Sequence, residues 1–185
     1  NAVSLITSIS DVFGSGIIVP GTGVILHNRA ADFVMEEGHP NAAAPGKRVR
    51  HTILPAMMLN TDGSLRLSFG CMGANMQPQG QVQILVNLID RGMNLQQAID
   101  APRVRALDGR RISAEPHPDC PGFAGRLAAL GHDVVSGEEV PADWTLPHDF
   151  MRTFEGSAQA IQIEHGGHSL CGASDPRLGC IACPC

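Results

Sequence analysis

The chain has 185 residues, a formal net charge of −5, 43% hydrophobic residues and 17% charged residues. This composition excludes intrinsic disorder as the default state and is typical of one folded domain spanning residues 1–185. The acidic balance argues against nucleic acid as a partner, because phosphate binding depends on clustered cations. The apolar runs are shorter than a bilayer span requires, so no membrane segment is expected.

The first half of the chain is expected to be rich in strands. Apolar stretches with β-branched or small hydroxyl residues predict strands at residues 1–10, 17–19, 24–26, 53–59 and 65–69. The turn signals Pro20-Gly-Thr-Gly23 and Asn60-Thr-Asp-Gly63 join the last four of these strands into two hairpins. Residues 36–50 lack periodicity, which predicts a loop long enough to suggest a functional role.

The second half contains the clearest helix signal. Val82, Leu85, Val86 and Ile89 follow i, i+3, i+4, i+7 spacing, which predicts an amphipathic helix with Gly92 as its C-cap. Shorter helices are expected at residues 95–100 and 123–130, strands at 111–115, 133–136, 158–164 and 169–171, and a polar insertion at 137–154. Strands, then helices, then strands, without βαβ alternation, favour a layered α+β domain.

Two segments carry residues suited to chemistry on a substrate. Residues 69–80 predict a strand that ends in a small-residue turn and opens into a helix, and backbone N–H groups there can stabilise an oxyanion. The alternative is a tight structural connection. Asn28-Arg-Ala-Ala-Asp32 follows a predicted strand and is a potential clamp for an amine and a carboxylate, although a solvated loop has the same composition.

Two further segments have weaker chemical signals. Arg50-His51-Thr52 offers an anion-binding group, or a histidine that only satisfies its own loop. Potential zinc ligands occur near the end of the chain, at His165, His168, Cys171, Cys180, Cys183 and Cys185. Ordinary buried or frayed cysteines are the alternative, and no metal is assigned.

Several motifs, in chain order, resemble the small subunit of the γ-glutamyltransferases. They are Phe13-Gly-Ser-Gly16, Ala98-Ile-Asp-Ala-Pro-Arg103, Gly156-Ser-Ala-Gln-Ala-Ile161 and Gly172-Ala-Ser-Asp-Pro-Arg177. Others resemble the γ-glutamyltransferase-like branch that includes the class IV cephalosporin acylases. These are Pro20-Gly-Thr-Gly23, His51-Thr-Ile-Leu-Pro-Ala-Met57, Phe69-Gly-x-Met-Gly73 and Gln77-Pro-Gln-Gly80. The resemblance runs from Asn1 to about Cys180.

The resemblance implies a four-layer αββα sandwich of the N-terminal nucleophile hydrolase type, built from two subunits cut from one precursor. This chain would then supply the small-subunit portion, with the large subunit of the same precursor as its partner. The family's nucleophile is a threonine that cleavage exposes and whose own α-amine acts as the base. The resemblance places that threonine upstream of Asn1, and it implies no cofactor.

The resemblance also implies roles for individual residues. Asp32 would hold the α-amine of the substrate, and Arg29 would assist with its α-carboxylate. His51 and Thr52 stand where transpeptidases carry paired serines, so carboxylate recognition is expected to differ. Ser10 falls where transpeptidases carry asparagine.

Three further positions concern the reaction itself. Ser8 resembles the hydroxyl residue beside the nucleophile. The backbone N–H groups of Gly73 and Ala74 would form the oxyanion hole.

The expected reaction is acyl transfer from a γ-glutamyl or glutaryl-type amide, a small molecule, to the N-terminal threonine, followed by release to water. The alternative is a catalytically inactive partner of the same fold. A third hypothesis is a metal-dependent module built on His165, His168 and the tail cysteines. The sequence leaves the acceptor, the compartment and the oligomeric state open.

Overall fold

A computed structural model describes residues 1–135, 155–164, 169–179 and 181–182. The chain divides into two compact units, one formed by Asn1–Leu5 with Leu54–Cys185 and the other by Ile6–Ile53. That the two units make up a single domain, as expected, stays a prediction. The predicted insertion at residues 137–154 lies outside the described residues.

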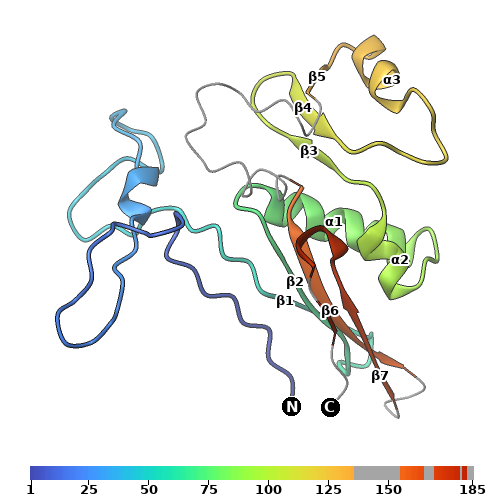
Figure 1. Cartoon of the computed structure of the whole chain (residues 1–185), viewed down its shortest axis with the longest axis horizontal. Coiled ribbons are helices and arrows are strands. Elements are labelled where there is room, and N and C mark those ends of the chain that lie inside the picture. The colour runs from blue at the N-terminus through green and yellow to red at the C-terminus, as the bar shows by residue number, and fades with distance from the viewer. Residues whose placement is uncertain (136–154, 165–168, 180, 183–185) are drawn as a thin grey trace. The chain divides into compact units, whose positions relative to one another are not determined.

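The larger unit is built on a four-stranded antiparallel sheet (Figure 1). Its strand order is β1-β2-β6-β7, with β1 at Ala56–Leu59, β2 at Leu65–Met72, β6 at Ser157–Glu164 and β7 at Ser169–Ser174. The Gly63 N–H donates to the Asn60 carbonyl at 2.9 Å, which closes the β1–β2 turn. All four strands and this turn confirm predictions, with shifted ends.

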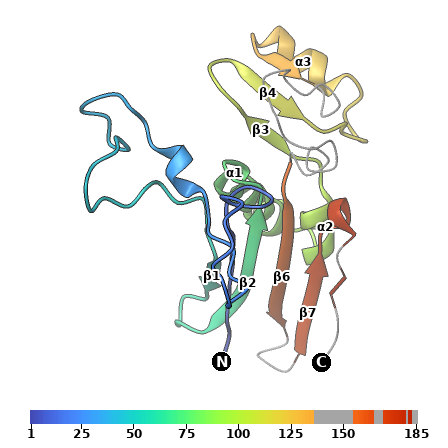
Figure 2. The same cartoon turned by 60° about the vertical axis from the view of Figure 1, so that its left-hand side comes forward.

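Helices α1 (Met76–Ile89) and α2 (Leu95–Asp100) cover one face of this sheet (Figure 2). Helix α2 begins with a capping box. The Asn94 side chain accepts from the Gln97 N–H at 2.9 Å, and the Gln97 side chain accepts from the Asn94 N–H at 3.1 Å. The core between helices and sheet comprises Leu67, Phe69, Cys71, Ile84, Leu88, Leu95, Ala98, Ile99, Ala158, Ala160 and Ala173. A sheet covered by helices on one side confirms the α+β class.

The buried side of α1 differs from the predicted stripe. Val82 and Ile89 are 58% and 50% exposed, whereas Ile84 and Leu88 face the core. Gly80 explains which side of α1 faces the sheet, because a Cβ at this position would lie 2.9 Å from the Cys71 sulfur on β2. The helix therefore rests on the side where a glycine permits close approach. Gly92 has the expected left-handed φ of 66°, just beyond the helix end.

A second, three-stranded sheet follows in the order β3-β4-β5. Strands β3 (Val104–Ala106), β4 (Arg111–Ala114) and β5 (Asp133–Val135) surround helix α3 (Phe123–Ala129) in the sequence. Strands β4 and β5 are parallel and α3 packs on β5, so β4-α3-β5 is a βαβ unit. The expectation of no βαβ alternation is wrong here, because α3 supplies the crossover that parallel strands need.

Two predicted strand regions are corrected. Residues 1–10 form no strand, because the hydrogen bonds that join this segment to β2 run through hydroxyl side chains and not through a backbone ladder. The Ser4 hydroxyl donates to the Phe69 carbonyl of β2 at 2.9 Å. In the smaller unit, the hairpin expected over residues 17–26 is reduced to one isolated bridge between Ile18 and Ile25.

The rest of the smaller unit is mostly irregular. A 3-10 turn spans Arg29–Asp32, and an isolated bridge joins Val34 to Ala42. Residues 36–50 contain no helix or extended strand, as predicted. Among the described helices of the whole chain, none is long and apolar enough to cross a lipid bilayer.

Candidate active site

The turn between β2 and α1 presents two backbone N–H groups. Gly73 and Ala74 both have positive φ, at 123° and 51°, and they connect the end of β2 at Met72 to the start of α1 at Met76. Their carbonyls accept from the N–H groups of Met76 and Gln77 at 2.8 and 3.1 Å, which starts the helix. Within the described residues neither Gly73 nor Ala74 donates its own N–H, so both donors are available to an incoming oxygen.

Close backbone packing sets the shape of this turn. A Cβ on Gly73 would lie 3.0 Å from the Gly156 Cα, and a Cβ on Gly156 would lie 2.3 Å from the Met72 carbonyl oxygen. Gly156 also has a left-handed φ of 74°. Both positions therefore require glycine, which gives the Gly156 motif a physical reason.

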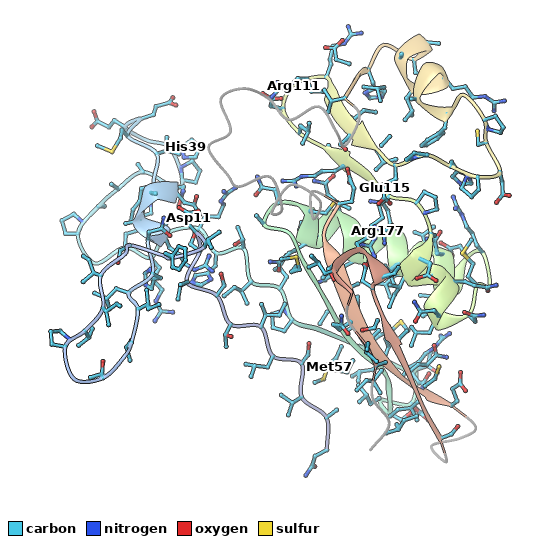
Figure 3. The ribbon with its side chains drawn as sticks, in the orientation of Figure 1. Asp11, His39, Met57, Arg111, Glu115 and Arg177 are labelled. Atoms are coloured by element: carbon cyan, nitrogen blue, oxygen red, sulfur yellow. The ribbon has the colours of Figure 1, made fainter. Side chains whose placement is uncertain are left out.

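Behind the turn lies a buried ion network that the sequence analysis did not anticipate. Arg103 is 1% exposed, and its Nη2 donates to the Asp175 carboxylate at 2.7 Å. Arg177 donates to the same carboxylate at 3.0 Å and to Glu115 at 2.5 and 2.7 Å. Figure 3 shows Glu115 and Arg177 beside each other. The signal was present, since Arg103, Asp175 and Arg177 lie in two of the quoted motifs.

The surroundings of Arg177 keep its guanidinium charged. Burial opposes the charge on Arg177, but the hydrogen bonds and charges of Glu115 and Asp175 outweigh it and raise the Arg177 pKa. Burial lowers the pKa of Arg105, which Glu155 partly offsets.

Two other buried groups favour their neutral forms. Burial raises the pKa of Glu155, although the Ser113 hydroxyl donates to its carboxylate. Burial also raises the pKa of the Cys71 thiol, which keeps it protonated near neutrality and makes it a poor nucleophile.

In the smaller unit, the structure brings Arg29 and Thr52 together. Arg29 is 3% exposed, and its Nη1 donates to the Thr52 hydroxyl at 3.2 Å. Its Nη2 is buried without a hydrogen-bond partner in the described part of the chain. A buried guanidinium with an unused donor is suited to a carboxylate, which accepts such bonds strongly.

The other predicted substrate residues lie in the same unit. Asp32 ends the 3-10 turn that Arg29 begins, and its backbone carbonyl accepts from the Asn41 side chain at 2.6 Å. The Ser8 hydroxyl accepts from the Ser10 N–H at 3.0 Å, and Ser10 has a φ of 80°. His51 is exposed. The roles of these residues stay predictions.

Asn28, the first residue of the predicted clamp, also makes structural hydrogen bonds that the sequence did not indicate. Its side chain accepts from the Asp11 N–H at 3.1 Å and donates to the Asp11 carboxylate. Its N–H donates to the Ile9 carbonyl at 3.2 Å. These bonds tie the segment that contains Ser8 and Ser10 to the residue preceding Arg29.

Most of the candidate metal ligands lie outside the described residues, so the zinc hypothesis stays untested. His165, His168, Cys180, Cys183 and Cys185 lie outside them. Cys171 is described and is a free thiol. Elsewhere in the described chain, no three side chains of suitable type cluster closely enough to hold a metal ion.

The antiparallel sheet covered by helices, the glycine-rich turn and the solved structures that the chain resembles place it among the N-terminal nucleophile hydrolases. The family model described as gamma-glutamyltranspeptidase matches residues 1–183. The chain therefore belongs to the γ-glutamyltranspeptidase family, and the expected resemblance is confirmed.

Individual relatives agree with this assignment. The chain is 38% identical over 183 residues to an oxamate amidohydrolase proenzyme of Klebsiella pneumoniae, and 42% identical over 184 residues to a glutathione hydrolase-like proenzyme of Bacillus subtilis. These alignments cover 95% and 96% of this chain but 32% of each relative. The chain thus spans about a third of the length of the curated relatives it matches.

Solved structures show the same likeness. A γ-glutamyltranspeptidase from Pseudomonas nitroreducens superposes with a TM-score of 0.80 and 27% identity, covering 100% of this chain and 94% of that one. A cephalosporin acylase from Bacillus halodurans gives a TM-score of 0.77 and 36% identity, covering 92% of this chain and 29% of that one. The two structures correspond to the two branches that the motifs resemble.

Proposed function

We propose that this chain is the small-subunit portion of an amide hydrolase or acyltransferase that acts on γ-glutamyl or glutaryl-type amides. The observation that carries the proposal is the Gly73–Ala74 turn, whose two N–H groups are available at the start of α1. The nucleophile in this proposal is an N-terminal threonine on a segment preceding Asn1.

The turn's role follows from where charge develops during acyl transfer. The threonine hydroxyl attacks the amide carbonyl and gives its proton to the α-amine of the same residue. The carbonyl oxygen becomes an oxyanion, which the N–H groups of Gly73 and Ala74 stabilise. The C–N bond breaks and the leaving amine takes that proton. Water then attacks the ester and gives a proton to the α-amine, which forms a second oxyanion at the same donors. Its collapse breaks the ester C–O bond, releases the acid and returns the proton to the threonine oxygen.

Recognition of the acyl group falls to Arg29 and its neighbours. The unused Nη2 of Arg29 donates to a substrate carboxylate, with Thr52 holding the guanidinium in place. Asp32 is half-buried, and its carboxylate supplies a partner for an α-ammonium when the substrate has one. Glutaryl amides lack that ammonium and depend on Arg29 alone. Comparing γ-glutamyl with glutaryl amides therefore distinguishes the contribution of Asp32 from that of Arg29.

The face of the β1-β2-β6-β7 sheet opposite helices α1 and α2 is where the large subunit binds in this proposal. Side chains that alternate away from the helices include Met57, Ile161 and Leu170, which are 45%, 51% and 64% exposed. An apolar sheet face of this kind is stable when a second sheet packs on it. In the αββα arrangement that second sheet comes from the remainder of the precursor.

The test uses the full-length protein that contains this chain. γ-Glutamyl p-nitroanilide and glutaryl p-nitroanilide are supplied in turn, p-nitroaniline release is followed, and intact mass detects an acyl adduct on the N-terminal threonine. We expect release from at least one anilide, together with the adduct. If the protein shows no p-nitroaniline release and no acyl adduct, the proposal is refuted and the inactive-partner hypothesis is favoured.

Arg29→Gln tests the acyl contact within the same assay. We expect KM to rise by about 10- to 100-fold, because a charge-assisted hydrogen bond contributes roughly 1.5–3 kcal/mol. Arg48→Gln is the matched control, since Arg48 is an exposed arginine of the same unit. Equal KM values for both variants would remove Arg29 from the proposed site.

A further inference from the structure

Arg103 reaches the backbone that supports the Gly73–Ala74 turn. Its Nη1 donates to the carbonyls of Glu155 and Gly156 at 3.1 and 3.3 Å. Its Nη2 donates to the Ile99 carbonyl at 3.0 Å as well as to Asp175. One guanidinium therefore joins the end of α2 to the residues that enter β6.

Asp175 holds Arg103 in that position. Asp175 is 0% exposed, and the oxygen that accepts from Arg103 also accepts from the Ala158 N–H of β6 at 2.9 Å. Its other oxygen accepts from Arg177 Nη1 at 3.0 Å and from the Arg177 N–H at 3.1 Å. A buried carboxylate with all these donors has little freedom to move, so the geometry of Arg103 is fixed on two sides.

Gly156 transmits that geometry to the turn. The register pairs Met72 of β2 with Ser157, the residue after Gly156. A Cβ on Gly73 would lie 3.0 Å from the Gly156 Cα, so the two backbones are in direct contact. A displacement of the Gly156 carbonyl would therefore move Met72 and Gly73, and with them the N–H groups aimed at the oxyanion.

We propose that Arg103, held by Asp175, is a positioning residue that sets the N–H groups of Gly73 and Ala74 through the backbone of Gly156. This inference rests on the proposed function, because it assigns the network a role in that reaction. A displaced donor weakens the transition state more than substrate binding, since the oxyanion forms only during reaction. The role therefore predicts a change in kcat with little change in KM.

Arg103→Lys is the decisive variant. Lysine keeps the positive charge opposite Asp175, but a single ammonium cannot reproduce the fork that holds both the carboxylate and the two carbonyls. Arg177→Lys is the matched control, because Arg177 shares Asp175 but donates to neither the Glu155 nor the Gly156 carbonyl. Both variants should lose thermal stability, so kinetics are compared at a temperature where both are folded.

We expect Arg103→Lys to lower kcat by at least about tenfold, but by less than the roughly 10²–10³-fold loss caused by removing an oxyanion donor outright. KM should stay within about twofold of the wild-type value. Acylation and deacylation rates, measured by single turnover, should fall together because both pass through an oxyanion. Arg177→Lys should lower kcat by a clearly smaller factor, because Arg177 reaches Asp175 but not the two carbonyls beside the turn. An equal fall in kcat for both variants would show that the network is only structural and would overturn the proposal.

Asp175→Asn keeps the proposal testable if Arg103→Lys does not fold. Asparagine retains an acceptor for the Ala158 N–H but loses the charge that fixes Arg103. We expect kcat to fall without a matching rise in KM, and an unchanged kcat would refute the role. A wild-type protein inactive on both anilides would overturn the proposed function and this inference with it, whereas active wild type with unaffected variants would overturn this inference alone.

Discussion

Replacing Gly156 by alanine tests the contact between the turn and β6. The new Cβ would lie 2.3 Å from the Met72 carbonyl oxygen and 3.0 Å from the Cys71 sulfur. The residue also has a φ of 74°, a conformation that alanine adopts at a cost of about 1–2 kcal/mol. Because the nearest atom belongs to the backbone of β2, no side-chain rotation relieves the clash.

The expected loss is the sum of two parts that a control separates. Gly92→Ala carries only the conformational cost, since Gly92 has a φ of 66° and a Cβ there meets nothing within 4 Å. We expect Gly92→Ala to lower the free energy of unfolding by about 1–2 kcal/mol. Gly156→Ala adds the overpacking cost of about 1–3 kcal/mol, for a total of roughly 2–5 kcal/mol.

The assay combines stability and turnover of the full-length protein. Denaturant unfolding measures the two losses, and p-nitroanilide hydrolysis measures kcat at a temperature where both variants are folded. Gly156→Ala should lower kcat because the displaced Met72 carries Gly73 with it, whereas Gly92→Ala should retain kcat. If the two variants lose equal stability and equal activity, the packing of Gly156 does not support the Gly73–Ala74 turn.

Two further substitutions check separate parts of the reasoning. Ala74→Gly should leave stability unchanged or raise it by up to about 1 kcal/mol, because relief of the 51° φ is partly offset by unfolded-state entropy. It should retain kcat, and a tenfold loss in hydrolysis assays would contradict a purely backbone role. For Glu155, burial raises the folded pKa above its ordinary value, so its protonated form contributes stability at low pH that is lost as pH rises through the folded pKa. Glu155→Gln should therefore gain in thermal midpoint over wild type as pH rises from about 5 to about 8, and a pH-independent difference would refute the assignment.

Local hydrogen-bonding signals explain why much of the fold was predictable. Helix α2 agrees with its predicted range because Asn94 and Gln97 cap it within four residues of sequence. The Asn60–Gly63 turn is likewise encoded by residues that bond to one another. In contrast, β3 has only three residues and no alternating pattern long enough to detect.

The candidate site was predictable only in part. The motifs indicated the Gly73–Ala74 turn and Arg29, but they gave no sign that Arg29 would be buried against Thr52. The ion pair between Arg103 and Asp175 joins positions 72 residues apart, and no local pattern records such a pairing. Periodicity also failed to predict the buried side of α1. It identifies apolar positions along the helix, but it does not show which side chains of the neighbouring strand pack against them.

By itself, the sequence determined the family, the identity of most elements and the small-residue turn, since each depends on residues close together in the chain. Only the tertiary structure decided which side of α1 faces the sheet, that β4 and β5 run parallel, and that Arg103 meets the carbonyls of Glu155 and Gly156. These outcomes depend on the fit between distant segments, such as Gly80 against Cys71, and van der Waals contact is a property of the assembled pair.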